Sequence, residues 1–325
     1  MRIPGIDRPL SALALGSHYY RLDDSSRWHG LLDHYLEAGG TLLDTARSYG
    51  GSEQVIGRWL ADRAVRDRLT LLTKGGHGTR HGVTGGDFAA VIEAELSTSL
   101  EVLGTEQVEL YLLHRDSLAF DVGTIIEALN TELRRGRIRA IGASNWEYDR
   151  IEQANAYARE RGLQGFSVIS NHLALARSAA PFWPGLVSVG PDGWNWHRRT
   201  GVPLLVFSSQ ARGFFSGRFE PHQRGAAPGT LDELDARVLE VYGSDANFAR
   251  LERARRLGRD KGGYSATQVA LAWLLHQPLP LLPIIGPRDR EELAASFDAL
   301  SLRLTPEETR WLDTGRSLNG SGTSG

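Results

Sequence analysis

The sequence predicts an α/β fold of the (β/α)8 TIM barrel class, in a single domain. Eight short apolar runs recur along the 325 residues, and longer amphipathic segments lie between most of them. Runs that are apolar on both faces and separated by helices indicate parallel strands that are covered on each side. Eight such units suit a closed barrel, and barrels of this kind often reach this length as one domain.

The eight expected strands are five to seven residues long, and most are rich in Leu, Ile or Val. They span residues 12–16, 41–45, 69–74, 108–114, 138–144, 166–170, 203–209 and 281–286. Helical patterns span residues 26–39, 52–63, 86–104, 122–136, 147–162 and 265–278. Several of these patterns open with a Ser or Asp cap and close on Gly, as helix starts and stops do.

Two long segments interrupt this alternation. Residues 172–202 are rich in Trp, Pro and Gly, and residues 210–246 follow the seventh strand. We expect both to be long loops, which in barrels are usually functional. The barrel domain should cover residues 1–316, and the small and polar residues 317–325 predict a flexible C-terminal tail.

A doubly wound sheet is the competing fold. Such a sheet usually carries G-x-G-x-x-G after its first strand to hold a dinucleotide. The chain contains neither this pattern nor the phosphate loop G-x-x-x-x-G-K-[ST]. The motifs therefore favour the barrel.

The composition narrows the function classes. The formal net charge of −2 gives no reason to expect a nucleic-acid or membrane partner. The absence of cysteine excludes disulfides, thiolate metal sites and cysteine nucleophiles. The N-terminus does not resemble a signal peptide, and no apolar run is long enough to span a bilayer. We expect a cytoplasmic enzyme or binding protein, and the oligomeric state stays open.

Polar side chains end three neighbouring strands of the predicted barrel. Asp44 closes the second strand, and Tyr49 follows five residues later. Lys74 closes the third strand, and His114 closes the fourth. Taken singly, such residues are more often helix caps, solvated strand ends or half-buried aromatics. The carboxyl ends of barrel strands meet at one face, however, so we expect the four side chains to share one rim.

The chemistry of these four groups fits together. A free phenol has a pKa of about 10, and a nearby ammonium group lowers that pKa. An Asp44 carboxylate could hold the Lys74 ammonium beside Tyr49, which would then act as a general acid. His114 could orient a carbonyl oxygen. No group of the set is a nucleophile, so the set suits protonation of an oxygen while hydride from a nicotinamide attacks carbon.

Five segments, in order and at the expected spacings, resemble the aldo-keto reductase family. They are LLDTARSYGGSEQVIGRWL (42–60), LTLLTKGG (69–76), ELYLLHRD (109–116), GRIRAIGASNW (136–146) and LPIIGPRDREELAASFDAL (282–300). The resemblance runs nearly end to end. It implies a (β/α)8 barrel that reduces an aldehyde or ketone with NADPH and without a metal. It assigns proton donation to Tyr49, its tuning to Lys74 and Asp44, and carbonyl orientation to His114.

The resemblance also implies a set of cofactor contacts. Ser144 and Asn145 match the pair that holds the nicotinamide carboxamide, Ser170 stands where relatives often have Gln, and Phe207 matches the stacking aromatic. The remaining positions, for the pyrophosphate and the adenosine 2′-phosphate, are Ser208, Gln210, Arg212, Gly213, Gly286, Arg288 and Arg290. Arg288 and Arg290 favour NADPH, because a guanidinium suits the 2′-phosphate. Glu292 and Ser296 depart from the Arg or Gln and the Asn of relatives, so NADH stays an alternative.

Substrate contacts should lie in the loops over the barrel mouth. The candidates are His18, Tyr19, His77 and Trp146, together with Trp183, Trp194 or Trp196 of the long sixth connection. His77 and His81 lie four apart in a glycine-rich loop without a third ligand, so no metal site is expected. Two other functions stay open: a cofactor-binding regulatory subunit that acts through a protein partner, and a sugar dehydrogenase working in the oxidative direction.

Overall fold

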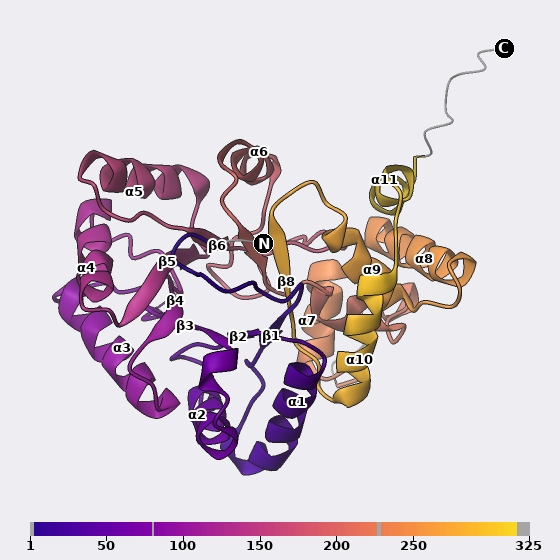
Figure 1. The fold of residues 1–325 in the computed structure, drawn as a ribbon. Coiled ribbons are helices and arrows are strands. Elements are labelled where there is room, and N and C mark those ends of the chain that lie inside the picture. Colours follow the sequence, from indigo (N-terminus) through magenta and orange to yellow (C-terminus); the bar gives the residue numbers. More distant parts are fainter. Residues whose placement is uncertain (1–2, 80, 226–228, 317–325) are drawn as a thin grey trace.

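The computed structural model describes residues 3–79, 81–225 and 229–316, and it confirms the predicted closed barrel (Figure 1). Eight parallel strands follow one another around the barrel in sequence order, and β8 pairs with β1 to close it. The strands are β1 (Ala14–Gly16), β2 (Leu42–Asp44), β3 (Thr70–Gly75), β4 (Val108–Leu113), β5 (Ile138–Ser144), β6 (Val168–Ser170), β7 (Leu204–Val206) and β8 (Leu281–Ile285). Each lies inside, or within one residue of, the run that predicted it.

Helices surround the strands in Figure 1. They are α1 (Ser25–Glu37), α2 (Ser52–Arg63), α3 (Phe88–Leu103), α4 (Val122–Arg134), α5 (Tyr148–Glu160), α6 (Pro191–Thr200), α7 (Glu233–Tyr242), α8 (Asp245–Asp260), α9 (Ala266–Leu275), α10 (Arg290–Asp298) and α11 (Pro306–Thr314). Side chains cap several of these helices; Asp87, for example, accepts hydrogen bonds from the first amides of α3. Within the described residues, no helix combines the length and apolar character needed to cross a membrane.

The two long segments contain more regular structure than the sequence predicts. Residues 172–202 include α6, and residues 210–246 include two 3-10 turns, α7 and the start of α8. The expectation of two long loops was therefore wrong in part. Helix α6 contains a glycine, Gly193, at which an added Cβ would lie 2.1 Å from the Tyr148 ring. Close packing, rather than helix propensity, explains a helix at this position. The predicted tail, residues 317–325, lies outside the described residues.

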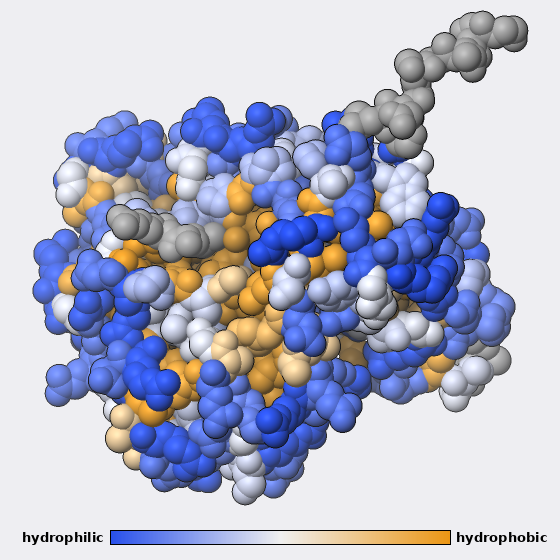
Figure 2. Space-filling view, turned by 45° about the vertical axis from the view of Figure 1, so that its right-hand side comes forward, coloured by the Kyte–Doolittle hydropathy of each residue, from blue (hydrophilic) through white to orange (hydrophobic). Residues whose placement is uncertain are grey.

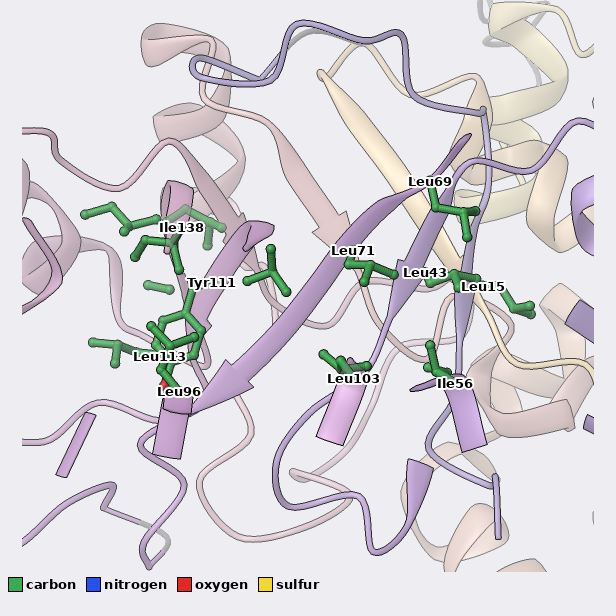
Figure 3. Close-up of a cluster of buried hydrophobic side chains, with 14 of the residues drawn as sticks. Leu15, Leu43, Ile56, Leu69, Leu71, Leu96, Leu103, Tyr111, Leu113 and Ile138 are labelled. Carbon is green, nitrogen blue, oxygen red and sulfur yellow. The ribbon is translucent and has the colours of Figure 1, made fainter. Parts of the chain in front are cut away.

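The core has two layers, as expected for a barrel. One layer fills the space between the strands and the outer helices. Figure 3 shows part of it, where Leu43 and Leu71 from the strands face Ile56 of α2 and Leu103 of α3. The other layer fills the barrel interior, with Leu72, Leu110 and other strand residues.

The N-terminal segment closes one end of the barrel. Ile3 and Ile6 are buried and belong to the same cluster as the interior strand residues. In Figure 1 this indigo segment passes across the barrel. Figure 2 shows apolar residues gathered toward the middle of one face, with hydrophilic residues around them. The cavity described below lies at the opposite end of the barrel, where the strands finish.

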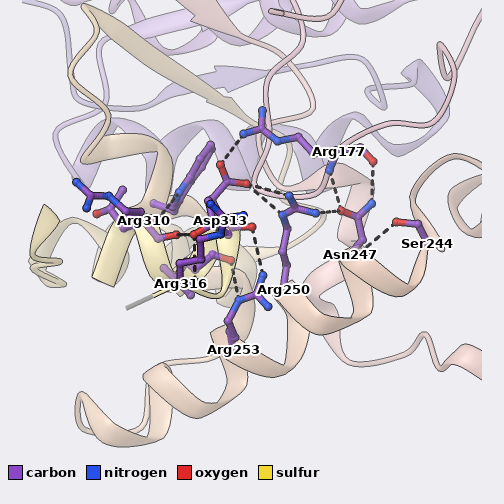
Figure 4. A network of polar contacts seen from close by, with 12 residues as sticks. Arg177, Ser244, Asn247, Arg250, Arg253, Arg310, Asp313 and Arg316 are labelled. Atoms are coloured by element: carbon purple, nitrogen blue, oxygen red, sulfur yellow. Dashed lines mark hydrogen bonds and ion pairs between the residues drawn. The ribbon is translucent and has the colours of Figure 1, made fainter. Parts of the chain in front are cut away.

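A network of ion pairs joins the sixth connection to the last helix (Figure 4). Asp313 of α11 pairs with Arg177 at 2.8 Å and with Arg250 of α8 at 3.0 Å. Asn247 exchanges two hydrogen bonds with the backbone of Arg177, at 2.9 and 2.7 Å. We call Arg177, Asn247, Arg250 and Asp313 the Asp313 clamp. It fixes the start of the segment that forms one wall of the mouth.

Candidate active site

A cavity of about 720 Å³ lies at the carboxyl ends of the strands. This volume is in the range of small-molecule and cofactor sites. The four polar residues that end β2 to β4 or follow them, Asp44, Tyr49, Lys74 and His114, all line the cavity. The parallel register contributes to this, because Asp44 pairs with Leu72 and Lys74 with Leu112, which places Lys74 and His114 two residues beyond the partner of the preceding rim residue.

Lys74 contacts both Asp44, which ends β2, and Tyr49, which follows it. Its Nζ lies 2.6 Å from Asp44 Oδ1 and donates to the Tyr49 hydroxyl at 3.3 Å. It also donates to the Thr45 carbonyl at 2.9 Å. Asp44 and Lys74 are 4% and 3% exposed, so the ion pair is shielded from water. The carboxylate, the ammonium and the phenol thus form one continuous chain.

A turn built on small residues brings Tyr49 back over the end of β2. Gly50 and Gly51 have φ angles of 44° and 100°, which residues other than glycine rarely adopt. Behind the turn, Ser52 bridges Ser17 and Thr45 through hydrogen bonds of 2.6 and 2.9 Å. The glycine pair and this hydroxyl cluster explain why a phenol five residues after Asp44 returns to the same rim.

Burial is the largest single influence on the pKa values of Tyr49 and Lys74. Burial raises the pKa of Tyr49, and the lowering by Lys74 only partly offsets this. The sequence predicted the lowering by Lys74 but not the net direction, because it does not reveal how deeply the phenol is buried. Burial is the largest single influence on the pKa of Lys74 and lowers it, but the charges and hydrogen bonds of Asp44 and Tyr49 together outweigh burial, and the pKa is raised. Lys74 therefore stays an ammonium ion at neutral pH.

His114 is held as a neutral imidazole. Burial, with Lys74 as the next cause, lowers its pKa well below the usual value of 6.5. Its Nδ1 lies 3.2 Å from Ser48 Oγ, and its ring meets the rings of Tyr49 and His77 edge to face at 5.5 and 4.9 Å. If the Ser48 hydroxyl donates the hydrogen bond to Nδ1, the ring proton of His114 lies on Nε2. His114 can then donate a neutral hydrogen bond into the cavity.

Most of the predicted cofactor positions line the same cavity. They are Ser144, Asn145, Ser170, Phe207, Ser208, Gln210, Arg212, Gly213, Gly286 and Arg288. Arg290 differs, because it is exposed at the start of α10 and is not among the lining residues. The reason is helical geometry: Glu292 and Ser296, which do line the cavity, lie on a different face of α10.

Arg288 is already occupied by an acid. Its guanidinium and its backbone amide donate to Glu292 at distances between 2.6 and 3.0 Å. This contact raises the pKa of Arg288, through the hydrogen bond first and the charge second. An anion that approaches Arg288 would have to compete with the Glu292 carboxylate.

Of the predicted substrate residues, His18, Tyr19, His77 and Trp183 line the cavity, whereas Trp194 and Trp196 do not. The His18 ring meets the Tyr49 ring edge to face at 4.9 Å, and burial lowers its pKa to about 4. The placement of Trp146 at the mouth was wrong. Trp146 is fully buried in the core and packs on Phe166, with ring centroids 5.0 Å apart.

The backbone explains the position of Trp146. Asn145 has a φ of 61° directly after β5, and its side chain bonds to the His114 carbonyl at 3.2 Å. The turn at Asn145 keeps that residue at the cavity while the next one enters the layer behind the sheet. An apolar side chain next to a cavity residue gains more by joining the core than by facing solvent.

Among the cavity residues that had no assignment from the sequence are Ser48 and Arg115. Ser48 precedes Tyr49, and Arg115 follows His114, so their positions next to predicted site residues were the available signal. In the described part of the chain, no group of three or more His, Asp or Glu side chains could hold a metal ion.

Comparisons with known proteins agree with this fold and site. The model of the Aldo/keto reductase family matches residues 12–314, so the chain belongs to this family. Family membership, together with relatives that are named reductases, makes it an NAD(P)H-dependent oxidoreductase. The resemblance inferred from the sequence motifs is thereby confirmed.

Three similar curated proteins are fungal reductases or dehydrogenases by name. The chain is 27% identical to aryl-alcohol dehydrogenase GME11368 of Pestalotiopsis microspora, over 88% of this chain and 71% of that protein. It is 29% identical to aldo-keto reductase ausK of Aspergillus calidoustus, over 87% and 71%. It is 27% identical to norsolorinic acid reductase A of Aspergillus parasiticus, over 89% and 71%.

Solved structures share the fold. An aldo/keto reductase from Klebsiella pneumoniae, in complex with NADP and acetate, superposes with a TM-score of 0.69 at 20% identity. That match covers 94% of this chain and 90% of the other. The thermostable aldo-keto reductase Tm1743, in complex with epalrestat, gives 0.70 at 21% identity and covers 96% and 98%.

Proposed function

We propose that this protein reduces an aldehyde or ketone to the alcohol with NADPH, with Tyr49 as the general acid. The observation that carries the proposal is the buried chain from Asp44 through Lys74 to Tyr49, with neutral His114 beside it in one cavity. The natural partner would be a small carbonyl compound. We also propose that residues 1–316 form the functional unit and that the protein acts in the cytoplasm.

The residues suggest how the reaction proceeds. A substrate carbonyl oxygen between the Tyr49 hydroxyl and His114 Nε2 would accept two hydrogen bonds. NADPH, when bound, supplies hydride to the carbonyl carbon. The phenol of Tyr49 donates its proton to the developing alkoxide, and Lys74 stabilises the phenolate that remains. Asp44 keeps Lys74 charged and in place.

The polar atoms around the cavity fit a dinucleotide. Ser170 Oγ and Arg212 Nε are buried and have no partner among the described residues, so both are available to a ligand. Ser208, Ala211 and Arg212 adopt φ angles of 49°, 49° and 52°, and such strain in non-glycine residues often marks a ligand-binding loop. Arg212 could pair with the pyrophosphate, and Ser170 with the nicotinamide carboxamide. These features support NADPH as the cofactor.

The test uses purified protein and a panel of neutral aldehydes, ketones and keto-sugars, followed through NADPH absorbance in both directions. We expect turnover that falls by about 10²-fold to 10⁴-fold in Tyr49→Phe, the range for loss of a general acid. The matched control is Tyr157→Phe, which removes a hydroxyl that bonds Glu127 on the outer helices. Tight NADPH binding with an inert panel would instead favour a regulatory subunit, and turnover only from alcohols would favour a dehydrogenase.

A further inference from the structure

The charges that line the cavity do not balance locally. Five cationic side chains line it: Lys74, Arg115, Arg212, Arg218 and Arg288. Four carboxylates line it: Asp44, Asp232, Asp235 and Glu292. Pairing uses most of them. Lys74 binds Asp44 at 2.6 Å, Arg218 binds Asp235 at 2.8 Å and Arg288 binds Glu292 at 2.6 Å.

The remaining carboxylate, Asp232, does not pair with either of the remaining cations, Arg115 and Arg212. Asp232 caps α7, where it accepts a hydrogen bond from the Asp235 amide at 2.7 Å. The acid next to Arg115 in sequence, Asp116, pairs with Arg150 at 3.1 Å. Within residues 3–79, 81–225 and 229–316, no carboxylate pairs with Arg115 or Arg212. Arg212 is the guanidinium proposed above for the cofactor, which leaves Arg115.

Arg115 is buried and incompletely bonded. It is 6% exposed, and its Nη1 donates to the Gly185 carbonyl at 2.7 Å. Its Nε has no partner among the described residues. Burial lowers the pKa of Arg115, but a guanidinium stays protonated in proteins. A buried cation without a counterion is costly, and an anion in the cavity would offset this cost.

Arg115 lies on the side of the cavity where the carbonyl would bind. It directly follows His114 at the end of β4, and it contacts the sixth connection, which also contributes Trp183 and Leu186 to the wall. The cofactor positions come instead from the ends of β5 to β8 and the segments that follow them.

We propose that Arg115 is a specificity-determining residue that binds an anionic group of the substrate, so that the preferred substrates are carbonyl compounds carrying a carboxylate. The proposal rests on the reductase function proposed above and names the substrate class of that site. A carboxylate matches the fork of N–H donors on a guanidinium better than a neutral ester or amide does.

The test compares 4-formylbenzoate with methyl 4-formylbenzoate, which differ in the charge at one end. Formylbenzoates substituted at positions 2 and 3, and 4-oxobutanoate, vary the distance between the carbonyl and the carboxylate. We expect the wild type to favour at least one acid over its uncharged analogue in kcat/KM. In Arg115→Met this preference should fall by about 10-fold to 150-fold, as for loss of a charge-assisted hydrogen bond, and mainly through KM.

Two further variants separate binding from structure. Arg115→Lys keeps the charge without the fork and should retain part of the preference. Arg134→Met, an exposed position on α4, should leave it unchanged. An equal loss for the acid and the ester in Arg115→Met would overturn the proposal, because it would show a structural role in holding Gly185.

A second readout does not depend on turnover. Calorimetry with NADP⁺ present should show that benzoate binds the wild type more tightly than benzamide, and that Arg115→Met removes the difference. Reduction of neutral aldehydes without any preference for acids would refute this inference while leaving the reductase function intact. An inert panel would refute the function, and equal binding of benzoate and benzamide would then also refute the role of Arg115.

Discussion

Asp44→Asn tests the role of the buried carboxylate most directly. The substitution keeps the size of the side chain and removes the charge that faces Lys74 Nζ at 2.6 Å. Lys74 would remain a buried cation without a counterion, bonded only to neutral acceptors such as the Thr45 carbonyl and the Tyr49 hydroxyl. Breaking a buried ion pair from one side typically costs about 3–5 kcal/mol.

The size of the effect on melting follows from the chain length. An unfolding entropy of about 2.1 cal/mol/K per residue gives roughly 0.7 kcal/mol/K for 325 residues. A loss of about 3–5 kcal/mol therefore lowers Tm by about 4–7 °C. The control Asp245→Asn removes the partner of Arg224 from an aspartate that is 86% exposed, and it should cost less than about 1 kcal/mol.

The pH dependence of the unfolding free energy tests the ion pair more specifically than the size of the loss does. In the wild type the pKa of Lys74 is raised, so its stabilising contribution persists below pH 10 and is lost only as the pH passes its folded value. In Asp44→Asn, uncompensated burial should bring that pKa below the unfolded value of about 10.4. The folded variant then releases the proton first, so its stability should rise with pH.

The assay is thermal and urea unfolding of both proteins at pH 7 and pH 9.5, followed by circular dichroism. We expect the difference in unfolding free energy between the wild type and Asp44→Asn to be smaller at pH 9.5 than at pH 7. The double variant Asp44→Asn/Lys74→Met should recover most of the stability that Asp44→Asn loses. A gap below about 1 kcal/mol at pH 7, or one that does not change with pH, would refute the account of the ion pair.

Three other perturbations test separate parts of the structure. Burial lowers the pKa of His172 to about 4, so the unfolded chain takes up the proton first, and the contribution of this histidine to stability should fall by about 3 kcal/mol from pH 6.5 to pH 4. His172→Gln should flatten this part of the urea-unfolding profile; an unchanged slope would contradict the assignment. Glu292→Gln should tighten NADP⁺ binding in calorimetry by about 2-fold to 5-fold, since it releases Arg288, and leave NAD⁺ binding unchanged. Equal changes for both cofactors would show that Arg288 does not meet the 2′-phosphate. Gly57→Ala would bring a Cβ to 2.1 Å from the Val102 carbonyl oxygen and should cost about 1–3 kcal/mol, whereas Gly30→Ala, with no atom within 4 Å, should be neutral or stabilising.

The positions of the strands were predictable because each is buried on both faces. A run such as Leu110 to Leu113 is apolar on both faces, and the polar residues that end most of the runs mark the rim. The register of a closed barrel then brings these rim residues together without further information. The grouping of Asp44, Lys74 and His114 in one cavity follows from that geometry.

Other features depend on packing that a single sequence does not display. Trp146 looked like a mouth residue because it follows Asn145, yet one positive φ angle directs it into the core. Arg115 had no role assigned from the sequence, and only the contacts of the nearby acids with other groups show that it has no counterion among the described residues. Helix α6 was hidden by a composition typical of loops.

The Asp313 clamp ties distant stretches of chain into one cooperative unit. Arg177 and Asp313 are 136 positions apart, yet their contact joins the wall of the mouth to the final helix. Backbone amides in the sixth connection and in α11 should therefore exchange hydrogen with solvent in concert, at rates set by a shared opening event. A small molecule that steadies the wall would slow exchange at α11, a helix it never touches.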